Sequence, residues 1–437
     1  MSNASESQTT EHNAEARRHL RRNYLAHAID GGFFGGALAF VNAQTVLPTA
    51  IKSLGGPNWL VSLAPVLALA GMAVPPIFTA HLIDRLSRYK PLLMATGVFQ
   101  RMPYLAAAIA LFAAAEGDTT TALAVVALAP LVSGLACGAT ATGWQNLVVR
   151  TVPENRRSSV MALRYGLSCV IGLGAGWVVK AVLAARPGAT GYGLLHLMAF
   201  GSLAMSYLAF SLIRETGLRP PVAAAPHGLR ENLQAIPRLV KSAGNLRLYL
   251  AAGAMASGIY ILIPFLAIYA RGVLGRPESY VGDLLVVQMA GAIAGNFAAA
   301  YLGDRFGGRL VILVSQATFI ALAAWSLVAA SDGSLRAIFF LFGFAFFALQ
   351  VGTMTMTLEI CPAARRATHL AIIALVNLPS MLAATAVGGL VWTGPERFPH
   401  VAGLAIACVT VSLVLMARVR EPRSSAMSSG QPRGRTV

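Results

Sequence analysis

Long apolar segments alternate with short polar connections along most of the chain. An α-helix of about 20 residues crosses the roughly 30 Å hydrocarbon core of a membrane. Twelve segments reach that length, so we predict membrane-spanning helices at 24–50, 58–80, 91–115, 120–149, 158–184, 191–213, 246–271, 280–302, 311–331, 335–360, 367–393 and 399–418. The pattern therefore predicts an all-α membrane protein with 12 transmembrane helices.

A longer polar connection at 214–245 separates the spans into two six-helix bundles, 24–213 and 246–418. The polar ends, 1–23 and 419–437, are predicted to be disordered cytosolic tails. Residues 1–23 have no apolar core, so we expect no cleavable signal peptide before the first span. Apolar residues at helical spacing in the connection predict an amphipathic helix on the membrane surface, whereas Pro237 favours a flexible linker. Both interpretations remain open.

Two short motifs recur in the two halves in the same order. The first runs Asp84-Arg85-Leu86-Ser87-Arg88 and recurs 220 residues later as Asp304-Arg305-Phe306-Gly307-Gly308-Arg309. The second runs Pro153-Glu154-Asn155-Arg156-Arg157 and recurs 209 residues later as Pro362-Ala363-Ala364-Arg365-Arg366. The repeat indicates that one six-helix unit was duplicated, and internal symmetry of this kind is typical of secondary transporters.

The composition supports a membrane location. Hydrophobic residues make up 56% of the chain and charged residues only 12%. Soluble globular domains carry about 25% charged residues, so this chain lacks the polar side chains to cover a water-facing surface. The four cysteines have no CxxC spacing, and we expect no disulfide framework, metal site or cofactor.

The net charge of +17 raises the alternative of nucleic-acid binding. The predicted topology places 25 Lys and Arg residues on the side of both termini and 7 on the other side. Positive charge collects on the cytoplasmic side of membrane proteins. We therefore expect both termini in the cytoplasm, a lipid bilayer as the surroundings and no nucleic-acid partner. The 30 Arg against 4 Lys indicate a GC-rich bacterial genome and hence a bacterial inner membrane.

The spans, the basic central connection and the paired Asp-Arg loops resemble the major facilitator superfamily. The family signature G-x-L-x-D-R-x-G-R-[RK] reads here Ala80-His81-Leu82-Ile83-Asp84-Arg85-Leu86-Ser87-Arg88-Tyr89, followed by Lys90. Ala80 and Ser87 replace the two glycines of the signature. The resemblance implies two rocking bundles with a gating latch made by Asp84, Arg85, Arg88, Asp304, Arg305 and Arg309. The alternative is that these charges only set the topology.

Drug/proton antiporters of this superfamily carry further signatures that are broken here. Where their span-4 motif R-x-x-x-G has arginine, this chain has Pro130. Span 5 keeps Gly172, Gly174 and Gly176 without the proline that should stand among them. The sequence therefore does not support an antiporting drug pump.

Three charged side chains lie well inside predicted spans, at Asp30, Arg101 and Arg164, where charge is costly and indicates function. Asp30 and Arg164 lie at similar depths in spans 1 and 5, which are neighbours in the family fold, so we predict that they pair. Asp30 would either take up a proton or cation during transport or form a static ion pair. Arg101 lies deeper, in span 3, where it would either bond helix carbonyls or bind an anionic substrate group.

Uncharged polar residues at central depth are candidates for lining a substrate cavity. For each of them, a bond between helices is the alternative explanation. The candidates are Asn42, Gln44, Thr45, Tyr260, Gln288, Asn296, Gln350 and Asn377. A cavity of this kind favours neutral, amphiphilic or zwitterionic organic solutes over polyanions.

We predict a monomeric secondary transporter of a small organic solute, working by alternating access, with protons as a candidate coupling ion. The chain has no Walker loop, HExxH motif or nucleophile elbow, so we do not expect an enzyme. A transporter-like sensor without transport activity is the alternative function.

Overall fold

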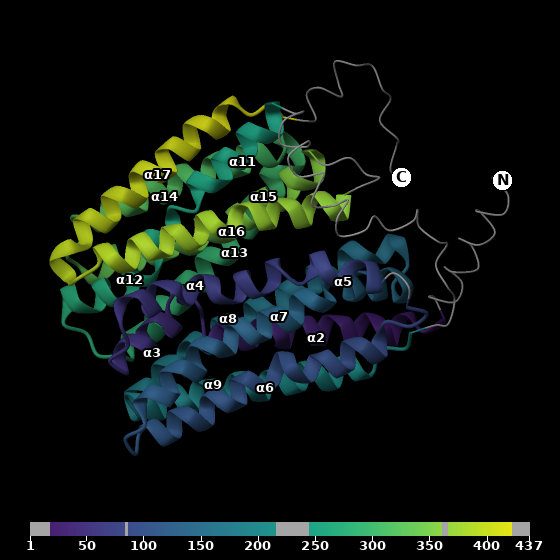
Figure 1. Ribbon diagram of the computed structural model, residues 1–437, viewed down its shortest axis with the longest axis horizontal. Coiled ribbons are helices and arrows are strands. Elements are labelled where there is room, and N and C mark those ends of the chain that lie inside the picture. The colour runs from purple at the N-terminus through teal and green to yellow at the C-terminus, as the bar shows by residue number, and fades with distance from the viewer. Residues whose placement is uncertain (1–17, 84–85, 216–243, 361–365, 422–437) are drawn as a thin grey trace. The chain divides into compact units, whose positions relative to one another are not determined.

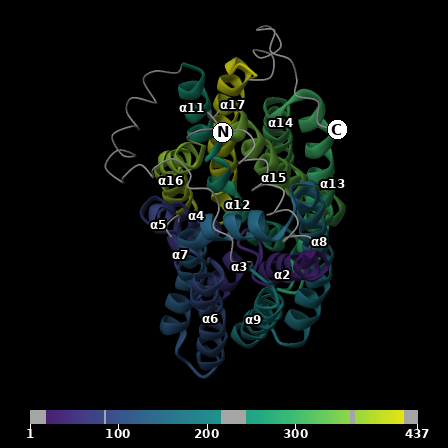
Figure 2. The same ribbon diagram turned by 90° about the vertical axis from the view of Figure 1, so that its right-hand side faces the viewer.

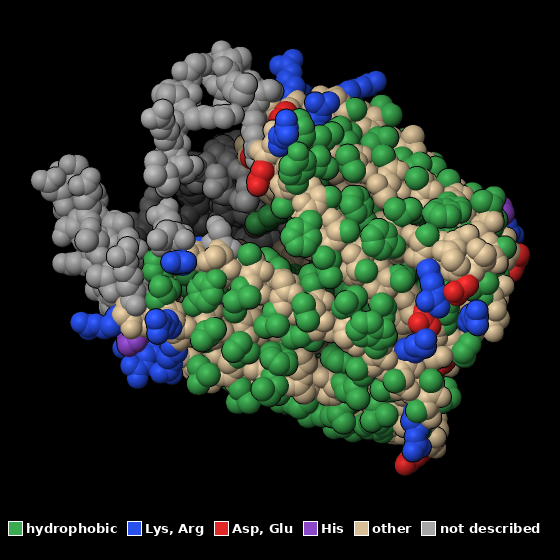
Figure 3. Space-filling view, turned by 180° about the vertical axis from the view of Figure 1, so that it is seen from behind, with side chains coloured by type: hydrophobic (Ala, Val, Ile, Leu, Met, Phe, Trp, Pro, Cys, Tyr) green, Lys and Arg blue, Asp and Glu red, His purple; other side chains and the backbone are tan. Residues whose placement is uncertain are grey.

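The computed structural model describes residues 18–83, 86–215, 244–360 and 366–421, and in these ranges the secondary structure is helical (Figure 1). Within them, nine helical stretches are long and apolar enough to cross a membrane, and two shorter apolar helices cover 58–73 and 377–391. Apolar side chains cover most of the face drawn in Figure 3, and charged residues gather toward its ends. The prediction of an all-α membrane protein is confirmed.

The described residues form two compact units, and α13 contributes to both. The first unit takes the described part of Met1–Glu231 together with Gly275–Val286. Its helices are α2 (Leu20–Phe40), α3 (Val46–Ser53), α4 (Asn58–Ala73), α5 (Pro76–Ile83), α6 (Lys90–Ala114), α7 (Thr119–Thr151), α8 (Glu154–Ala185), α9 (Ala189–Ser211) and the beginning of α13 (Tyr280–Phe306). In this unit α2 packs against α8 and α9, and α6 packs against α7 and α9 (Figure 2).

The second unit takes the described part of Asn232–Leu274 and Val287–Val437. Besides most of α13, it contains α11 (Gly244–Ala256), α12 (Ile259–Leu274), α14 (Gly308–Ser326), α15 (Asp332–Ile360), α16 (Arg366–Val391), the short η2 (Pro395–Arg397) and α17 (Phe398–Arg418). Here α17 packs against α11, α12 and α14, and α14 packs against α15.

The first predicted span, 24–50, is not one helix. It is divided at Asn42, whose side-chain Oδ1 accepts the backbone N–H groups of Gln44 and Thr45, both at 3.0 Å. The side chain competes with the backbone for these donors, which favours a turn over a continuous helix. The prediction of a continuous span is therefore wrong at this point, and α3 continues the chain after the turn.

Two other predicted spans are interrupted as well. Span 7 is divided into α11 and α12 at Ser257 and Gly258, and span 2 is divided into α4 and α5 at Val74 and Pro75. A side chain at Gly258 would collide with Cys408 of α17, so glycine allows α17 to approach the turn. Proline lacks the N–H that would continue the helix at position 75. Apolar composition predicted these spans but not their breaks.

Four glycines of α2 form a seam against α8. A Cβ atom at Gly32 would overlap Leu167, and one at Gly36 would overlap Ile171. Small residues let the backbones of membrane helices approach closely, and the gain is van der Waals contact along the whole seam. The seam brings the α2 backbone directly against the side chains of α8, including Arg164 next to Gly31.

The amphipathic helix predicted within the 214–245 connection lies outside the described residues. The first two residues of the predicted linker, Arg214 and Glu215, are described, and they contact the first bundle. Arg214 donates its backbone N–H to Asn23 Oδ1 at 2.8 Å, and Asn23 Nδ2 donates to Arg214 O at 3.1 Å. The first bundle thus extends two residues beyond the apolar segment that predicted it.

Candidate functional site

Asp30 lies inside the first unit, where only 4% of its surface is exposed. Its Oδ2 is 2.7 Å from Arg164 Nη1 on α8, and its Oδ1 accepts the Ser206 hydroxyl of α9 at 2.7 Å. Arg101 Nη2 of α6 lies 3.9 Å from Oδ1. These four residues, the Asp30 cluster, come from four helices, and the predicted pair of Asp30 and Arg164 is present.

Arg164 is held in place by more than its ion pair. Its Nη1 also donates to the carbonyl of His27 at 2.8 Å, and its guanidinium lies 4.9 Å from the ring centroid of Trp144 on α7. Gly31 leaves the space that this side chain occupies, since a Cβ there would overlap it. The glycine seam therefore serves the site as well as the packing.

Arg101 satisfies most of its donors with helix groups. Its Nε donates to Leu203 O at 2.9 Å, Nη1 donates to Gly97 O at 2.9 Å, and Nη2 donates to the Ser206 hydroxyl at 3.0 Å. Since Ser206 in turn donates to Asp30, its hydroxyl connects the arginine to the carboxylate through two hydrogen bonds. Of the two roles predicted for Arg101, this geometry matches bonding to helix carbonyls.

His27 adjoins the cluster, although the sequence pattern did not indicate it. It lies fully buried on α2, nearly one turn before Asp30, and its Nε2 is 2.8 Å from Thr151 Oγ1 of α7. Ser206 was missed as well, because its partner Asp30 lies 176 positions away in the sequence. The cluster therefore joins α2 and α8 to α6 and α9 through polar side chains, and Ser206 is the one that hydropathy does not single out.

A second polar group lies at the Glu215 end of the first unit. Glu215 accepts the backbone N–H groups of Tyr89 and Lys90, both at 2.8 Å, where α6 begins. It also pairs with Arg150 Nη1 of α7 at 2.9 Å, and both side chains are 3% exposed. Arg150 donates further to Ser87 O at 2.7 Å. We call Glu215 and these partners the Glu215 cap, because the carboxylate binds the amino terminus of α6.

The second unit repeats this arrangement. Glu421 Oε2 accepts the backbone N–H of Arg309 at 3.2 Å, where α14 begins, and the Arg309 guanidinium donates to the carbonyls of Met416 and Ala417. Asn245 and Arg420 exchange the same two bonds that Asn23 and Arg214 make. The sequence signal was the dipeptide Arg-Glu after each bundle, at 214–215 and 420–421. We call this the Glu421 cap.

The predicted gating residues are only partly described. Asp84 and Arg85 lie outside the described residues. Arg88 and Asp304 are exposed, Arg305 Nη1 donates to Tyr301 of its own helix at 3.2 Å, and Arg309 belongs to the Glu421 cap. The latch between bundles stays a prediction.

The cavity candidates occupy different environments. Asn42 holds the α2–α3 turn with Gln44 and Thr45, while Tyr260 and Gln288 are buried in the second unit. Asn377 of α16 lies against Gly253 of α11, Asn296 is half-buried and Gln350 is exposed. Their role in substrate binding stays a prediction.

The α8 end opposite the Glu215 cap carries contacts that the sequence did not indicate. Lys180 Nζ is 2.9 Å from Asp283 Oδ1 of α13, and the backbone N–H of Gly188 donates to Glu278 at 2.9 Å. Gly282 allows the backbones of α13 and α8 to meet at Lys180. All of these residues lie in the first unit.

Similar proteins were found in three comparisons. Residues 248–436 match the family model described as Major Facilitator Superfamily. The chain is 24% identical over 329 residues to the multidrug resistance protein MdtL of Shewanella oneidensis, covering 74% of this chain and 77% of that protein. It is 22% identical over 399 residues to MdtL of Klebsiella pneumoniae, covering 86% and 91% of the two chains.

Solved structures share the fold at low sequence identity. A D-xylose-proton symporter aligns with a TM-score of 0.68 at 14% identity, covering 93% of this chain and 99% of that one. A bacterial homologue of the iron transporter ferroportin, in its inward-facing state, aligns with a TM-score of 0.67 at 15% identity, covering 92% and 98%. The match over residues 248–436 and the shared fold therefore make the chain similar to the major facilitator superfamily of membrane transporters.

Proposed function

We propose that this protein carries a small, weakly charged organic solute by alternating access and couples that transport to protons through Asp30. Similarity to the major facilitator superfamily supports a multi-pass membrane protein that acts as a secondary transporter of a small solute. No comparison favours the alternative of a sensor without transport. The proton coupling, the class of solute and the direction are our proposals.

The proposed coupling rests on one observation, which is that Asp30 is bound by partners from other helices. A proton and the Arg164 guanidinium compete for the same carboxylate oxygens. A displacement of α8 along the glycine seam would lengthen the 2.7 Å contact and leave Oδ2 open to a proton. Returning α8 would expel the proton, so protonation of Asp30 and the position of α8 would be linked.

The alternative role for the Asp30 cluster is structural. A static pair would tie α2 to α8 and, through Ser206 and Arg101, to α9 and α6. Buried charges left without a partner are costly, so both roles require the pair to exist in the resting protein. They differ in what happens when the carboxylate is neutralised.

The proposed solute and direction follow from the polar candidates and the relatives. The relatives are named multidrug resistance proteins, and on that name we propose outward transport of organic molecules. Proline at position 130 and the missing proline in span 5 depart from the antiporter signatures. For this reason we propose the class of solute, weakly charged and amphiphilic, without transferring the substrate range of those proteins.

The proposed location is the inner membrane of a bacterium, with both termini in the cytoplasm. The support is the distribution of Lys and Arg, 25 on the side of the termini and 7 on the other. We also propose a monomer without enzymatic activity or nucleic-acid partner.

The test compares pH-driven transport with exchange in sealed proteoliposomes. A thermal-shift screen of neutral, zwitterionic and cationic amphiphiles first identifies a ligand that stabilises the protein. We expect Asp30→Asn to exchange labelled ligand across the membrane but to lose accumulation driven by a pH gradient. Asp118→Asn is the matched control, because Asp118 caps α7 outside the spans and asparagine caps a helix equally well.

Two results would contradict the coupling role. If Asp30→Asn accumulates ligand as the wild type does, Asp30 does not couple transport to protons. If the variant loses exchange and melts at a markedly lower temperature, the cluster is structural.

A further inference from the structure

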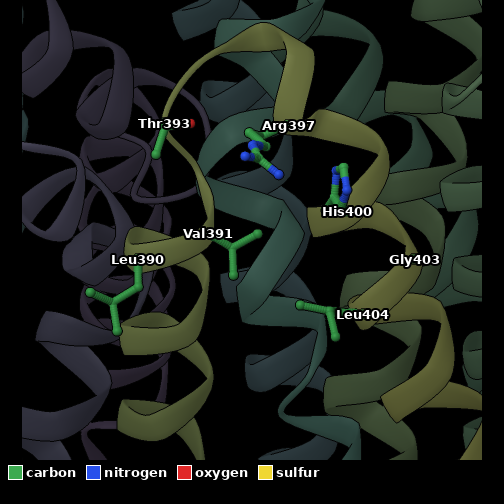
Figure 4. Close-up of a pocket in the computed structure, with 7 residues that line it drawn as sticks. All are labelled: Leu390, Val391, Thr393, Arg397, His400, Gly403 and Leu404. Atoms are coloured by element: carbon green, nitrogen blue, oxygen red, sulfur yellow. The ribbon is translucent and has the colours of Figure 1, made fainter.

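An open groove lies between the end of α16 and the beginning of α17, in the second unit. It has a volume of about 590 Å³ and is lined by Leu390, Val391, Thr393, Arg397, His400, Gly403 and Leu404. In Figure 4, Arg397 and His400 lie together at one end of the groove, with Leu390 and Leu404 farther along it. The α16–α17 groove thus has a cationic end and an apolar floor.

Aromatic packing fixes the two walls of the groove. Phe398, the first residue of α17, stacks on Tyr269 of α12 with ring centroids 3.5 Å apart. Trp392, directly after α16, stacks on Phe265 of the same helix at 4.7 Å. The helix ends on both sides of the groove are therefore packed against α12, which fixes the spacing between them.

The apolar part of the groove faces outward from the unit. Leu390 is 78% exposed and Leu404 is 40% exposed. A side chain added at Gly403 would meet no atom within 4 Å, so glycine leaves the middle of the groove open. Because both helices are apolar segments of a membrane protein, the medium around these leucines is the hydrocarbon of the bilayer.

The cationic end lies where the membrane-spanning segments of α16 and α17 meet the aqueous interface. Arg397 and His400 are three residues apart and therefore share one face of the helix start. The amino terminus of α17 adds the positive end of a helix dipole. The nearby Glu396 turns its carboxylate toward Gly394, and it does not line the groove.

We propose that the α16–α17 groove binds one anionic phospholipid of the surrounding leaflet. The phosphate lies against Arg397 and His400, and an acyl chain follows Leu390, Gly403 and Leu404. Charge and hydrophobicity change along the groove in the same order as along a lipid from headgroup to tail. This proposal is independent of the coupling role of Asp30.

The test measures lipid binding and lipid-induced stabilisation in the purified, detergent-solubilised protein. We expect native mass spectrometry to retain phosphatidylglycerol in preference to phosphatidylcholine, and phosphatidylglycerol to give the larger rise in melting temperature. Arg397→Gln with His400→Gln should abolish the preference and leave the two lipids equal. Arg186→Gln is the matched control, since Arg186 is an exposed arginine at the end of α8 and does not line the groove.

A second variant tests the acyl chain separately. Gly403→Leu fills open space in a helix of ordinary backbone geometry, so we expect it to fold and to lose retention of both lipids. Glycerol phosphate, which has the headgroup charge without a chain, should not stabilise the wild type. Unchanged preference in the double variant, unchanged retention in Gly403→Leu, or equal stabilisation by glycerol phosphate would each overturn the proposal.

Discussion

At the scale of single residues, the Asp30 cluster determines how the first unit tolerates charge in its interior. One carboxylate lies among two guanidinium groups, so the cluster carries net positive charge that helix carbonyls and the Trp144 ring offset. The carboxylate is the only group in the cluster that both arginines approach. Substitutions at residues that contact the carboxylate directly should therefore lower the unfolding free energy more than substitutions at residues that contact it indirectly.

Arg164→Gln should destabilise the protein strongly, because it leaves the Asp30 carboxylate without its direct ionic partner. Breaking a buried ion pair by removing one member costs about 3–5 kcal/mol of unfolding free energy. Arg336→Gln, which breaks a half-exposed pair with Asp332 at 2.7 Å, should cost at most about 1 kcal/mol. Denaturant unfolding in detergent measures both.

The double variant Asp30→Asn with Arg164→Gln distinguishes charge from packing. Neutralising both partners removes the unpaired charge, so the double variant should be more stable than Arg164→Gln alone. Equal stability of the two would show that the arginine acts through its contacts with His27 and Trp144.

At the scale of helices, the α2–α8 seam and the two caps decide where helices meet and where they begin. The seam depends on the absence of side chains from α2. The caps depend on carboxylates that come from segments following the last helix of each bundle. Small substitutions, such as alanine for glycine in the seam or glutamine for glutamate in a cap, should therefore disturb how these helices pack or begin.

Gly32→Ala should destabilise the first unit, because the added methyl group overlaps Leu167. Overpacking of this kind costs about 1–3 kcal/mol. Gly166→Ala on α8 is the matched control, since an added Cβ there meets no atom within 4 Å. Its effect should be neutral or stabilising, because alanine favours a helix by about 0.5–1 kcal/mol over glycine. The unfolding free energy of both variants is measured in detergent. An equal loss in the two would contradict the close packing of α2 against α8 at the seam.

Glu215→Gln should weaken the start of α6 more than Glu421→Gln weakens the start of α14. Glu215 has a buried arginine partner, whereas position 359, which matches Arg150 at the spacing of 209 residues, is glutamate. We expect a loss of about 3–5 kcal/mol in unfolding free energy for Glu215→Gln. Hydrogen exchange of the α6 and α14 amino-terminal amides, followed by mass spectrometry, would locate the effect. Faster exchange at α14 alone would contradict this ranking.

At the scale of the whole molecule, the topology prediction can be tested by labelling in cells. In a variant without the four native cysteines, single cysteines replacing Arg88 and Asp304 should react only with reagents that enter the cytoplasm. Cysteines replacing Arg186 and Thr393 should react with impermeant reagents from outside. Labelling of Arg88→Cys and Asp304→Cys from opposite faces would contradict the duplicated architecture.

The sequence predicted the helical class, the repeat and the pairing of Asp30 with Arg164, because hydropathy and spacing carry these features directly. It did not predict the turn at Asn42 or the break at Ser257, because both lie within segments that are long and apolar enough overall to predict one span. Ser206, His27 and the Glu215 cap were missed for a different reason. Their importance comes from contacts between residues more than 100 positions apart, which hydropathy does not record.

The repeated caps bear on how the chain can be divided for separate expression of its halves. A fragment that stops at Ser211, where α9 ends, would lack the carboxylate that receives the Tyr89 and Lys90 amides and neutralises Arg150. A second fragment that stops at Arg418 would lack Glu421, the carboxylate that accepts the backbone N–H of Arg309. Fragments of this protein should therefore end after Glu215 or Glu421, a few residues beyond the ends of the membrane helices.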